Sequence, residues 1–314
     1  MSNAEPTPQL IPQPRPLTRR GRWVLVVCGA VIAVLYALVV HFYNAEGGSL
    51  TYGGIGRTDA TGLVVTIEPV DVVPQTDRVT LNVSLEAQGA GIVDADQALI
   101  NPMRVLLVSS LGTQEVKYSA GELLGRFETV IGLDGEQALY PFDNYQGLFF
   151  VTAETVSPTS IQGAGAVRTV PVGLQSDGGV SGWDTIANFS DGMVANAAGE
   201  LDLTRSFSTR VFALLMLSLV IVLSGAALLV ASMVFTNRRR AEVTLLTWTG
   251  AVLFALPLLR TYLPYGPPVG AAIDVYVYLW AIVAAVSAVT LLVVAWLRQN
   301  RAVLEAAREK THGS

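Results

Sequence analysis

The side chains that most often carry catalysis or bind metals are few in this chain of 314 residues. Its histidines are His41 and His312 and its one cysteine is Cys28, which argues against a zinc, haem or iron–sulfur site. The sequence also lacks the glycine-rich phosphate loop that ends in Lys-Ser or Lys-Thr, and the Gly-x-Ser-x-Gly turn of serine hydrolases. We therefore predict no cofactor, no metal and no enzymatic activity.

Acidic pairs do occur, as in Asp94/Asp96 and Asp134/Glu136, and paired carboxylates can act as a general acid and base. Acidic residues are, however, abundant throughout this part of the chain. Residues 43–206 hold 20 Asp and Glu against 7 Arg and Lys, a net charge of −13. We interpret the excess as a solvated acidic surface, with cations or basic partners as the alternative. The same charge disfavours nucleic acid and anionic lipid as partners.

The segment Tyr140–Tyr145 combines residue types that restrict a backbone, in the order Tyr-Pro-Phe-Asp-Asn-Tyr. Pro141 fixes its own φ angle, Asp143 favours a turn, and aromatic rings surround both. An aromatic residue before proline also raises the chance of a cis peptide bond. Two interpretations remain open: a buried turn between two strands, or a loop resting on the membrane interface, where tyrosine is enriched.

A second over-specified segment runs from Arg260 to Asp274 and is rich in proline and glycine. It predicts a stiff hairpin whose two ends could be joined by an Arg260–Asp274 ion pair. We hypothesise that the Tyr140–Tyr145 turn docks on this hairpin and couples the acidic domain to the membrane. The candidate coupling residues are Tyr140, Pro141, Phe142, Asp143, Tyr145, Arg260, Pro264, Pro267 and Asp274.

Positioning these residues requires both membrane spans and a soluble domain. Mean hydropathy is +0.48, and four apolar runs each approach the roughly 20 residues that cross a bilayer as a helix. One run, 23–42, precedes the acidic segment 43–206. Three follow it within 207–297, at about 211–235, 243–259 and 275–297. Residues 1–22 predict a disordered leader, and residues 298–314 a tail.

Arginine and lysine flank the spans asymmetrically and predict the orientation. They cluster before the first run, between the second and third runs, and after the fourth run. We therefore expect both termini inside the cell and the acidic domain outside. The first run could instead be a cleaved signal peptide. Its length and the lack of a small-x-small cleavage site favour a retained anchor.

The acidic segment shows the periodicity of β-strands. Apolar Val79, Leu81, Val83 and Leu85 alternate with polar residues, and comparable short runs recur between glycine-containing turns. This pattern predicts an external, antiparallel β-sandwich-like domain of six to eight strands, in an α+β membrane protein with one transmembrane helix before the domain and three after it. The capping-box spacing of Ser119 and Glu122 also predicts a short helical turn.

The two over-specified segments, in this order and layout, resemble a family of actinobacterial membrane proteins known as domain of unknown function 4436. The turn at Tyr140–Tyr145 is similar to that family's Tyr-Pro-Phe-Asp-x-Tyr pattern. Leu258–Arg260, Pro267–Gly270, Asp274 and Leu279–Ala281 are similar to its carboxy-terminal signature. The resemblance extends over most of residues 20–300. It implies a mycobacterial or related actinobacterial source and a plasma-membrane location, and it implies no activity.

The leading functional hypothesis is a multi-pass plasma-membrane protein that acts by binding or assembly. Its expected partners are the bilayer and other membrane or cell-envelope proteins, or a second copy of itself. The alternative is a channel or transporter subunit in which the external domain senses a ligand. No charge lies deep in a span, although pumps and proton-coupled transporters usually need one.

Overall fold

The computed structural model of the chain describes residues 50–54, 61–89, 91–157 and 166–312, together with scattered helical positions between Trp23 and His41. The predicted leader and most of the first apolar run, including Cys28, lie outside the described residues. The chain divides into two units, Met1–Ala45 and Glu46–Ser314. The β-strands and the three long helices after them belong to the second unit.

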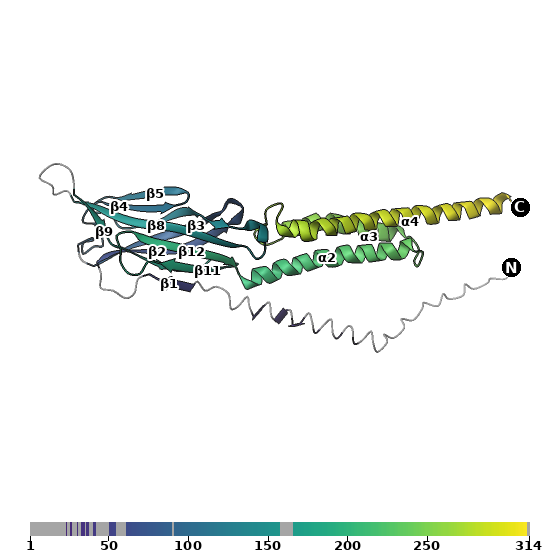
Figure 1. Cartoon of the computed structure of the whole chain (residues 1–314), viewed down its shortest axis with the longest axis horizontal. Helices are drawn as coiled ribbons and strands as arrows, with labels where there is room; N and C mark the ends of the chain where they lie inside the picture. The colour runs from purple at the N-terminus through teal and green to yellow at the C-terminus, as the bar shows by residue number, and fades with distance from the viewer. Residues whose placement is uncertain are drawn as a thin grey trace, which may run out of the picture. The chain divides into compact units, whose positions relative to one another are not determined.

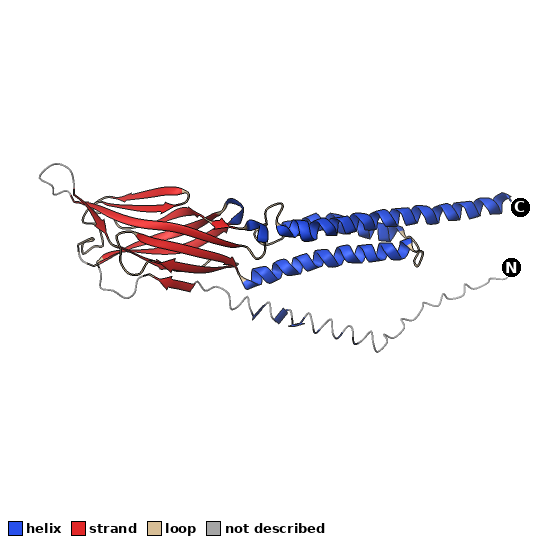
Figure 2. Cartoon of the chain, viewed as in Figure 1, coloured by secondary structure: helices blue, strands red, loops and turns tan. Residues whose placement is uncertain are grey.

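Two β-sheets pack together in the first part of this unit (Figures 1 and 2). The larger sheet has the order β1-β11-β12-β8-β4-β5, with β7 and β9 also paired to β8, and the smaller sheet has the order β10-β2-β3-β6. The larger sheet comprises β1 (Leu50–Gly53), β4 (Met103–Ser109), β5 (Gly112–Tyr118), β7 (Asp134–Gly135), β8 (Asn144–Ser157), β9 (Ala166–Val170), β11 (Trp183–Phe189) and β12 (Ala197–Arg205). The smaller sheet comprises β2 (Gly62–Val73), β3 (Arg78–Gln88), β6 (Arg126–Gly132) and β10 (Val172–Ser176).

Alternation of apolar and polar residues determines which face of each strand is buried. In β3, Val79, Leu81 and Val83 are fully buried while the residues between them are partly exposed. In β8, Tyr145 and Phe149 face inward in the same way. The inward faces of both sheets form one apolar core, as expected for strands whose side chains alternate between two faces. The sandwich-like domain predicted from the sequence is thus confirmed.

Three details of the sequence prediction are wrong. The described residues form twelve strands rather than six to eight, because strands as short as β7 are too brief to show alternation in the sequence. The sandwich is not wholly antiparallel, because β1 runs parallel to β11 and β10 runs parallel to β2. Neither pair is joined by a hairpin, so nothing in the connection forces an antiparallel pairing. The predicted helical turn at Ser119 is an ordinary turn. The Glu122 carboxylate accepts from the Ser119 N–H, but Gly121 has a φ of 80°, which ends the turn there.

Three described helices are long and apolar enough to cross a membrane: Phe207–Phe235, Val243–Thr261 and Asp274–Arg301. They correspond to α2 (Phe207–Phe235), α3 (Val243–Thr261) and the π-helical turn η3 (Asp274–Tyr278) followed by α4 (Leu279–His312). Two 3₁₀ turns, η1 (Pro74–Thr76) and η2 (Gln137–Leu139), lie in the β-rich part. Helix α4 continues to His312, through most of the predicted tail.

Small residues mediate the packing of α2 against α4. Ala227 and Ala231 of α2 are fully buried, and so are Ala285 and Ala288 of α4. Helices in lipid gain little from hydrophobicity alone, so close backbone approach at small residues is the usual basis of their association. Ala284, whose sequence spacing also fits a small-residue face, is only partly buried.

Candidate functional site

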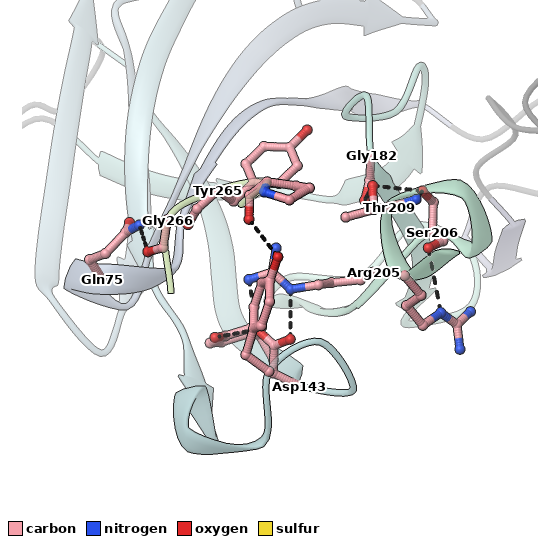
Figure 3. A network of polar contacts seen from close by, with 12 residues as sticks. Gln75, Asp143, Gly182, Arg205, Ser206, Thr209, Tyr265 and Gly266 are labelled. Atoms are coloured by element: carbon pink, nitrogen blue, oxygen red, sulfur yellow. Dashed lines mark hydrogen bonds and ion pairs between the residues drawn. The ribbon is translucent and has the colours of Figure 1, made fainter. Parts of the chain in front are cut away.

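A buried ion pair lies where the larger sheet meets helix α2. Arg205 Nε donates to Asp143 Oδ1 at 2.6 Å, and its Nη2 donates to Oδ2 at 2.8 Å (Figure 3). Both side chains are only 1% exposed. Tyr145 Oη donates to Asp143 Oδ2 at 2.8 Å, so the carboxylate accepts three hydrogen bonds. A carboxylate withdrawn from water to this extent depends on such partners.

Strand register explains why the two charges meet. On β8, Asp143 immediately precedes a strand whose inward positions begin with Tyr145. On β12, Arg205 continues the inward row of Leu201 and Leu203. Tyr145 is paired with Leu203, so the same register, extended by two residues, places Asp143 opposite Arg205.

Aromatic rings enclose the guanidinium group. The Arg205 Cζ atom lies 4.6 Å from the ring centroid of Tyr140, 4.7 Å from that of Trp183 and 5.6 Å from that of Tyr265. Its Nη1 atom is buried without a hydrogen-bond partner among the described residues. The electron-rich faces of the rings attract the guanidinium charge and stabilise it where a hydrogen-bond acceptor is lacking.

The side chains of Tyr140, Gln75 and Tyr265 make four hydrogen bonds between the sandwich and the hairpin that joins α3 to α4. Tyr140 Oη donates to the Pro264 carbonyl oxygen at 3.1 Å. Gln75 Nε2 donates to the carbonyl oxygens of Tyr265 at 2.7 Å and Gly266 at 2.6 Å (Figure 3). Tyr265 Oη donates in the opposite direction, to the carbonyl of Ser181 in the sandwich.

The start of α2 is bound to the same loop of the sandwich. Thr209 Oγ1 donates to the Gly182 carbonyl at 3.1 Å, and the Ser206 N–H donates to it at 3.0 Å. Gly182 has a φ of 80°, and a Cβ there would lie 2.4 Å from Tyr265 Oη, so this position requires glycine. Ser206 alone separates β12 from α2, so the last strand leads directly into the span.

The hairpin is closed by the ion pair that its sequence suggested. Arg260 Nε and Nη2 donate to the two Asp274 carboxylate oxygens, each at 2.7 Å. Arg260 Nη2 also donates to the Pro268 carbonyl at 3.1 Å, and the Gly270 N–H donates to Asp274 Oδ2 at 2.8 Å. Asp274 thereby connects both ends of the hairpin, at the first residue of the π turn.

The remaining predicted residues take different positions. Pro141 is buried and follows a cis peptide bond, and Pro267 is also buried. Phe142 is 62% exposed. Asp143 was expected at the hairpin, but it is bound by Arg205 and Tyr145, which belong to the sandwich. Within the turn, Tyr140 is the residue that reaches the hairpin.

Burial shapes the protonation of the tyrosines around Arg205. Burial raises the pKa of Tyr140 well above its usual value, although the positive charge of Arg205 opposes the shift. Burial and the hydrogen bond to Asp143 raise the pKa of Tyr145 in the same direction. Burial also raises the pKa of Tyr265. All three hydroxyls therefore remain protonated donors at neutral pH.

Sequence reasoning missed Arg205, Trp183 and Gln75. A signal for Arg205 was present, because it follows Leu201 and Leu203 at the spacing of one strand face, and a charge on a buried face needs a partner. Gln75 had no comparable signal, since its role depends on a hairpin 190 residues away in sequence.

Taken together, these contacts join the β-domain to the helix bundle both at the start of α2 and at the hairpin between α3 and α4. In the part of the chain that the structure describes, no group of three or more His, Cys, Asp or Glu side chains could hold a metal ion. The charges of Asp143 and Arg205, and those of Arg260 and Asp274, are neutralised within their ion pairs.

Two family models match the chain. One, a domain of unknown function (DUF4436), covers residues 54–202, and another, a domain of unknown function (DUF8686), covers residues 205–299. The hairpin motifs that resemble the first family thus fall within the second match. No curated protein matches the chain. The match over residues 54–202 supports assignment of the β-rich part of this chain to the DUF4436 family.

Proposed function

We propose that this chain is a multi-pass plasma-membrane protein of actinobacterial type that presents an acidic β-domain outside the cell, to bind or assemble with another membrane or envelope protein. In this proposal four helices cross the membrane, one before the domain and three after it, and both termini are cytoplasmic. The buried Asp143–Arg205 pair, enclosed at the point where β12 becomes α2, carries the proposal.

Such a junction supports a presenting role because it limits the tilt of the domain. A flexible linker would let the sandwich sample many orientations above the membrane. Here Ser206 is the only residue between β12 and α2, and Gln75, Tyr140 and Tyr265 bind the hairpin as well. A partner would meet a surface held at nearly constant height and angle, which lowers the entropy cost of binding.

Extraction in mild detergent, followed by crosslinking and mass spectrometry, tests the proposal. We expect crosslinks between the β-domain and a different membrane or envelope protein. The matched comparison is Asp143→Asn, which should weaken those crosslinks by loosening the domain while leaving the spans in the membrane. A chain that crosslinks to no other protein in either form would overturn the proposal.

A channel or transporter subunit is the alternative, and the hairpin is the observation that favours it. Asp274 forms the ion pair with Arg260 and is also the first residue of a π-helical turn. Such turns frequently mark functional sites in helices. Ligand binding to the domain could then act on α4 through Tyr265. A symmetric oligomer of this chain that conducts ions in planar bilayers would favour this alternative.

A further inference from the structure

The outer face of the larger sheet has a hollow where the partner of β8 changes. β4 pairs with β8 as far as Phe149, and β7 begins to pair with it at Gln146. Among the described strands, none therefore pairs with Gly147 and Leu148 on that side. A hollow of about 490 Å³ occupies this gap, which is large enough for a side chain or a small ligand.

The hollow exposes more apolar than polar surface, although it faces solvent. Leu148, Phe150 and Val108 contribute to its lining and are 59%, 44% and 39% exposed, respectively. Val108 lies directly opposite Phe150 across the β4–β8 pair, so the exposed apolar side chains are contiguous. Contiguous exposed apolar groups with a polar rim are typical of sites that bind another molecule.

An acidic hollow adjoins the apolar one. It measures about 540 Å³ and shares Asp134 and Gln146 with its neighbour. Glu136 and Asp202 also line it, and no lining residue in the described part of the chain is Arg, Lys or His. Glu200 adds a further carboxylate, since it lies opposite Leu148 on β12.

Charge decides which kind of partner fits. A second copy of this chain would bring another acidic domain, of net charge −13 over residues 43–206, against these carboxylates. Anionic lipid or nucleic acid would be repelled in the same way. A protein segment that carries a large apolar side chain followed by Lys or Arg would satisfy both hollows at once.

We propose that this paired surface, the apolar hollow at Leu148 and the acidic hollow at Asp134, binds a basic segment of a partner protein through one apolar anchor. At about 3.4 Å per strand residue, Gln146 lies roughly 10 Å along β8 from Asp143 at the junction. The site is therefore near the start of α2, where the segment next to a partner's own membrane span could reach it. This inference rests on the proposed binding function and specifies its surface.

Binding of short synthetic peptides to the full chain in phosphatidylcholine nanodiscs tests the site. One peptide alternates Leu with Lys, a second alternates Leu with Glu, and a third alternates Ser with Lys, all of equal length. With empty nanodiscs as background, we expect the Leu-Lys peptide to bind at least about tenfold more tightly than either of the others, a difference of about 1.4 kcal/mol.

Variants of the chain separate the two hollows. Leu148→Ser should weaken binding of the Leu-Lys peptide about tenfold, whereas Val167→Ser, which removes an equally exposed apolar side chain (61%) from β9, should not. Asp134→Asn with Asp202→Asn should weaken binding at low salt and reduce its salt dependence, because screened charge attraction is lost. Unchanged binding by Leu148→Ser, or equal binding of the Leu-Glu peptide, would overturn the proposal.

A photo-crosslinking amino acid at position 148, compared with one at position 167, distinguishes the two levels of inference in cells. A heterologous partner that crosslinks from 148 through a Lys- or Arg-containing segment, and not from 167, supports both. A partner that crosslinks elsewhere on the domain refutes this surface and leaves the binding function standing. A chain that crosslinks only to copies of itself refutes the binding function. The peptide experiment then tests separately whether the paired hollows bind a basic segment.

Discussion

At the scale of single residues, Asp143 and Arg205 are interdependent. Either charge alone, in a site that is 1% exposed, would lack the partner that makes its burial tolerable. Tyr145 donates a hydrogen bond to Asp143, and the rings of Tyr140 and Trp183 pack on Arg205. The stability of the site therefore depends on charge, on hydrogen bonding and on packing.

Removing one member of the pair should cost far more than removing both. We expect Asp143→Asn to lower the free energy of unfolding by about 3–5 kcal/mol, because Arg205 is left buried beside a neutral amide. The double variant Asp143→Leu with Arg205→Met should be less destabilised than Asp143→Asn. Tryptophan fluorescence during denaturation in detergent reports the transition when the other four tryptophans are replaced by Phe, since the ring of Trp183 packs on Arg205. A double variant at least as destabilised as Asp143→Asn would contradict this interdependence.

Alkaline pH should loosen the junction through its tyrosines. The folded-state pKa of Tyr145 is raised above the unfolded value near 10, so its contribution to stability is complete below about pH 10 and is lost as pH rises further. Tyr145→Phe should therefore be less stable at neutral pH, by about 1.5–3 kcal/mol for the lost hydrogen bond to a charged acceptor, and should show a shallower decline above pH 10. Melting temperatures across pH measure both effects. Tyr262→Phe, at a 65% exposed tyrosine, is the control and should follow the wild-type profile.

At the scale of elements, the sequence predicted the strands and helices better than it predicted how the strands pair and which loops meet. The alternation at Val79–Leu85 and the apolar runs after residue 207 were readable, because burial on one face or in lipid imposes a period or a length. Parallel pairing of β10 with β2 was not readable, since it depends on where a chain returns after crossing between sheets. The position of Gln75 beside the hairpin was hidden for the same reason.

The contacts of Gln75 should determine how firmly the hairpin is held. Gln75→Ala removes hydrogen bonds to the carbonyls of Tyr265 and Gly266, so we expect faster hydrogen exchange in residues 262–272 than in the wild type. The control is Gln114→Ala, whose side chain donates to Glu128 far from the hairpin. An equal exchange rate in the hairpin of both variants would show that the Gln75 contacts add nothing.

Close packing of α2 against α4 should be intolerant of added volume. Ala285 is fully buried, so Ala285→Leu should destabilise the helix bundle by about 1–3 kcal/mol. Ala251→Leu makes the same change at an exposed position of α3 and should change little. Resistance to thermal aggregation in detergent compares the two. A bundle that accepts Leu at 285 as readily as at 251 would contradict the packing described.

At the scale of the whole molecule, presentation and stability are linked, because the contacts that hold the sandwich upright also bury the charges. The proposed binding surface includes Leu148 of β8 and Asp134 of β7, which pairs with β8, and Asp143 immediately precedes β8. Loosening of the junction should consequently weaken partner binding even though no residue of the surface has changed. Photo-crosslinking from position 148 to the membrane-bound partner, compared between the wild type and Asp143→Asn, checks this expectation. An Asp143→Asn variant that remains folded and binds as the wild type does would separate the two properties.

The ion pair also has a consequence for inheritance. Asp143 belongs to the region matched by one family model and Arg205 to the region matched by the other. Each region thus carries half of a salt bridge that is harmful without its counterpart. Recombination that joined either region to an unrelated neighbour would produce an unpaired buried charge. We therefore expect the two regions to be inherited together.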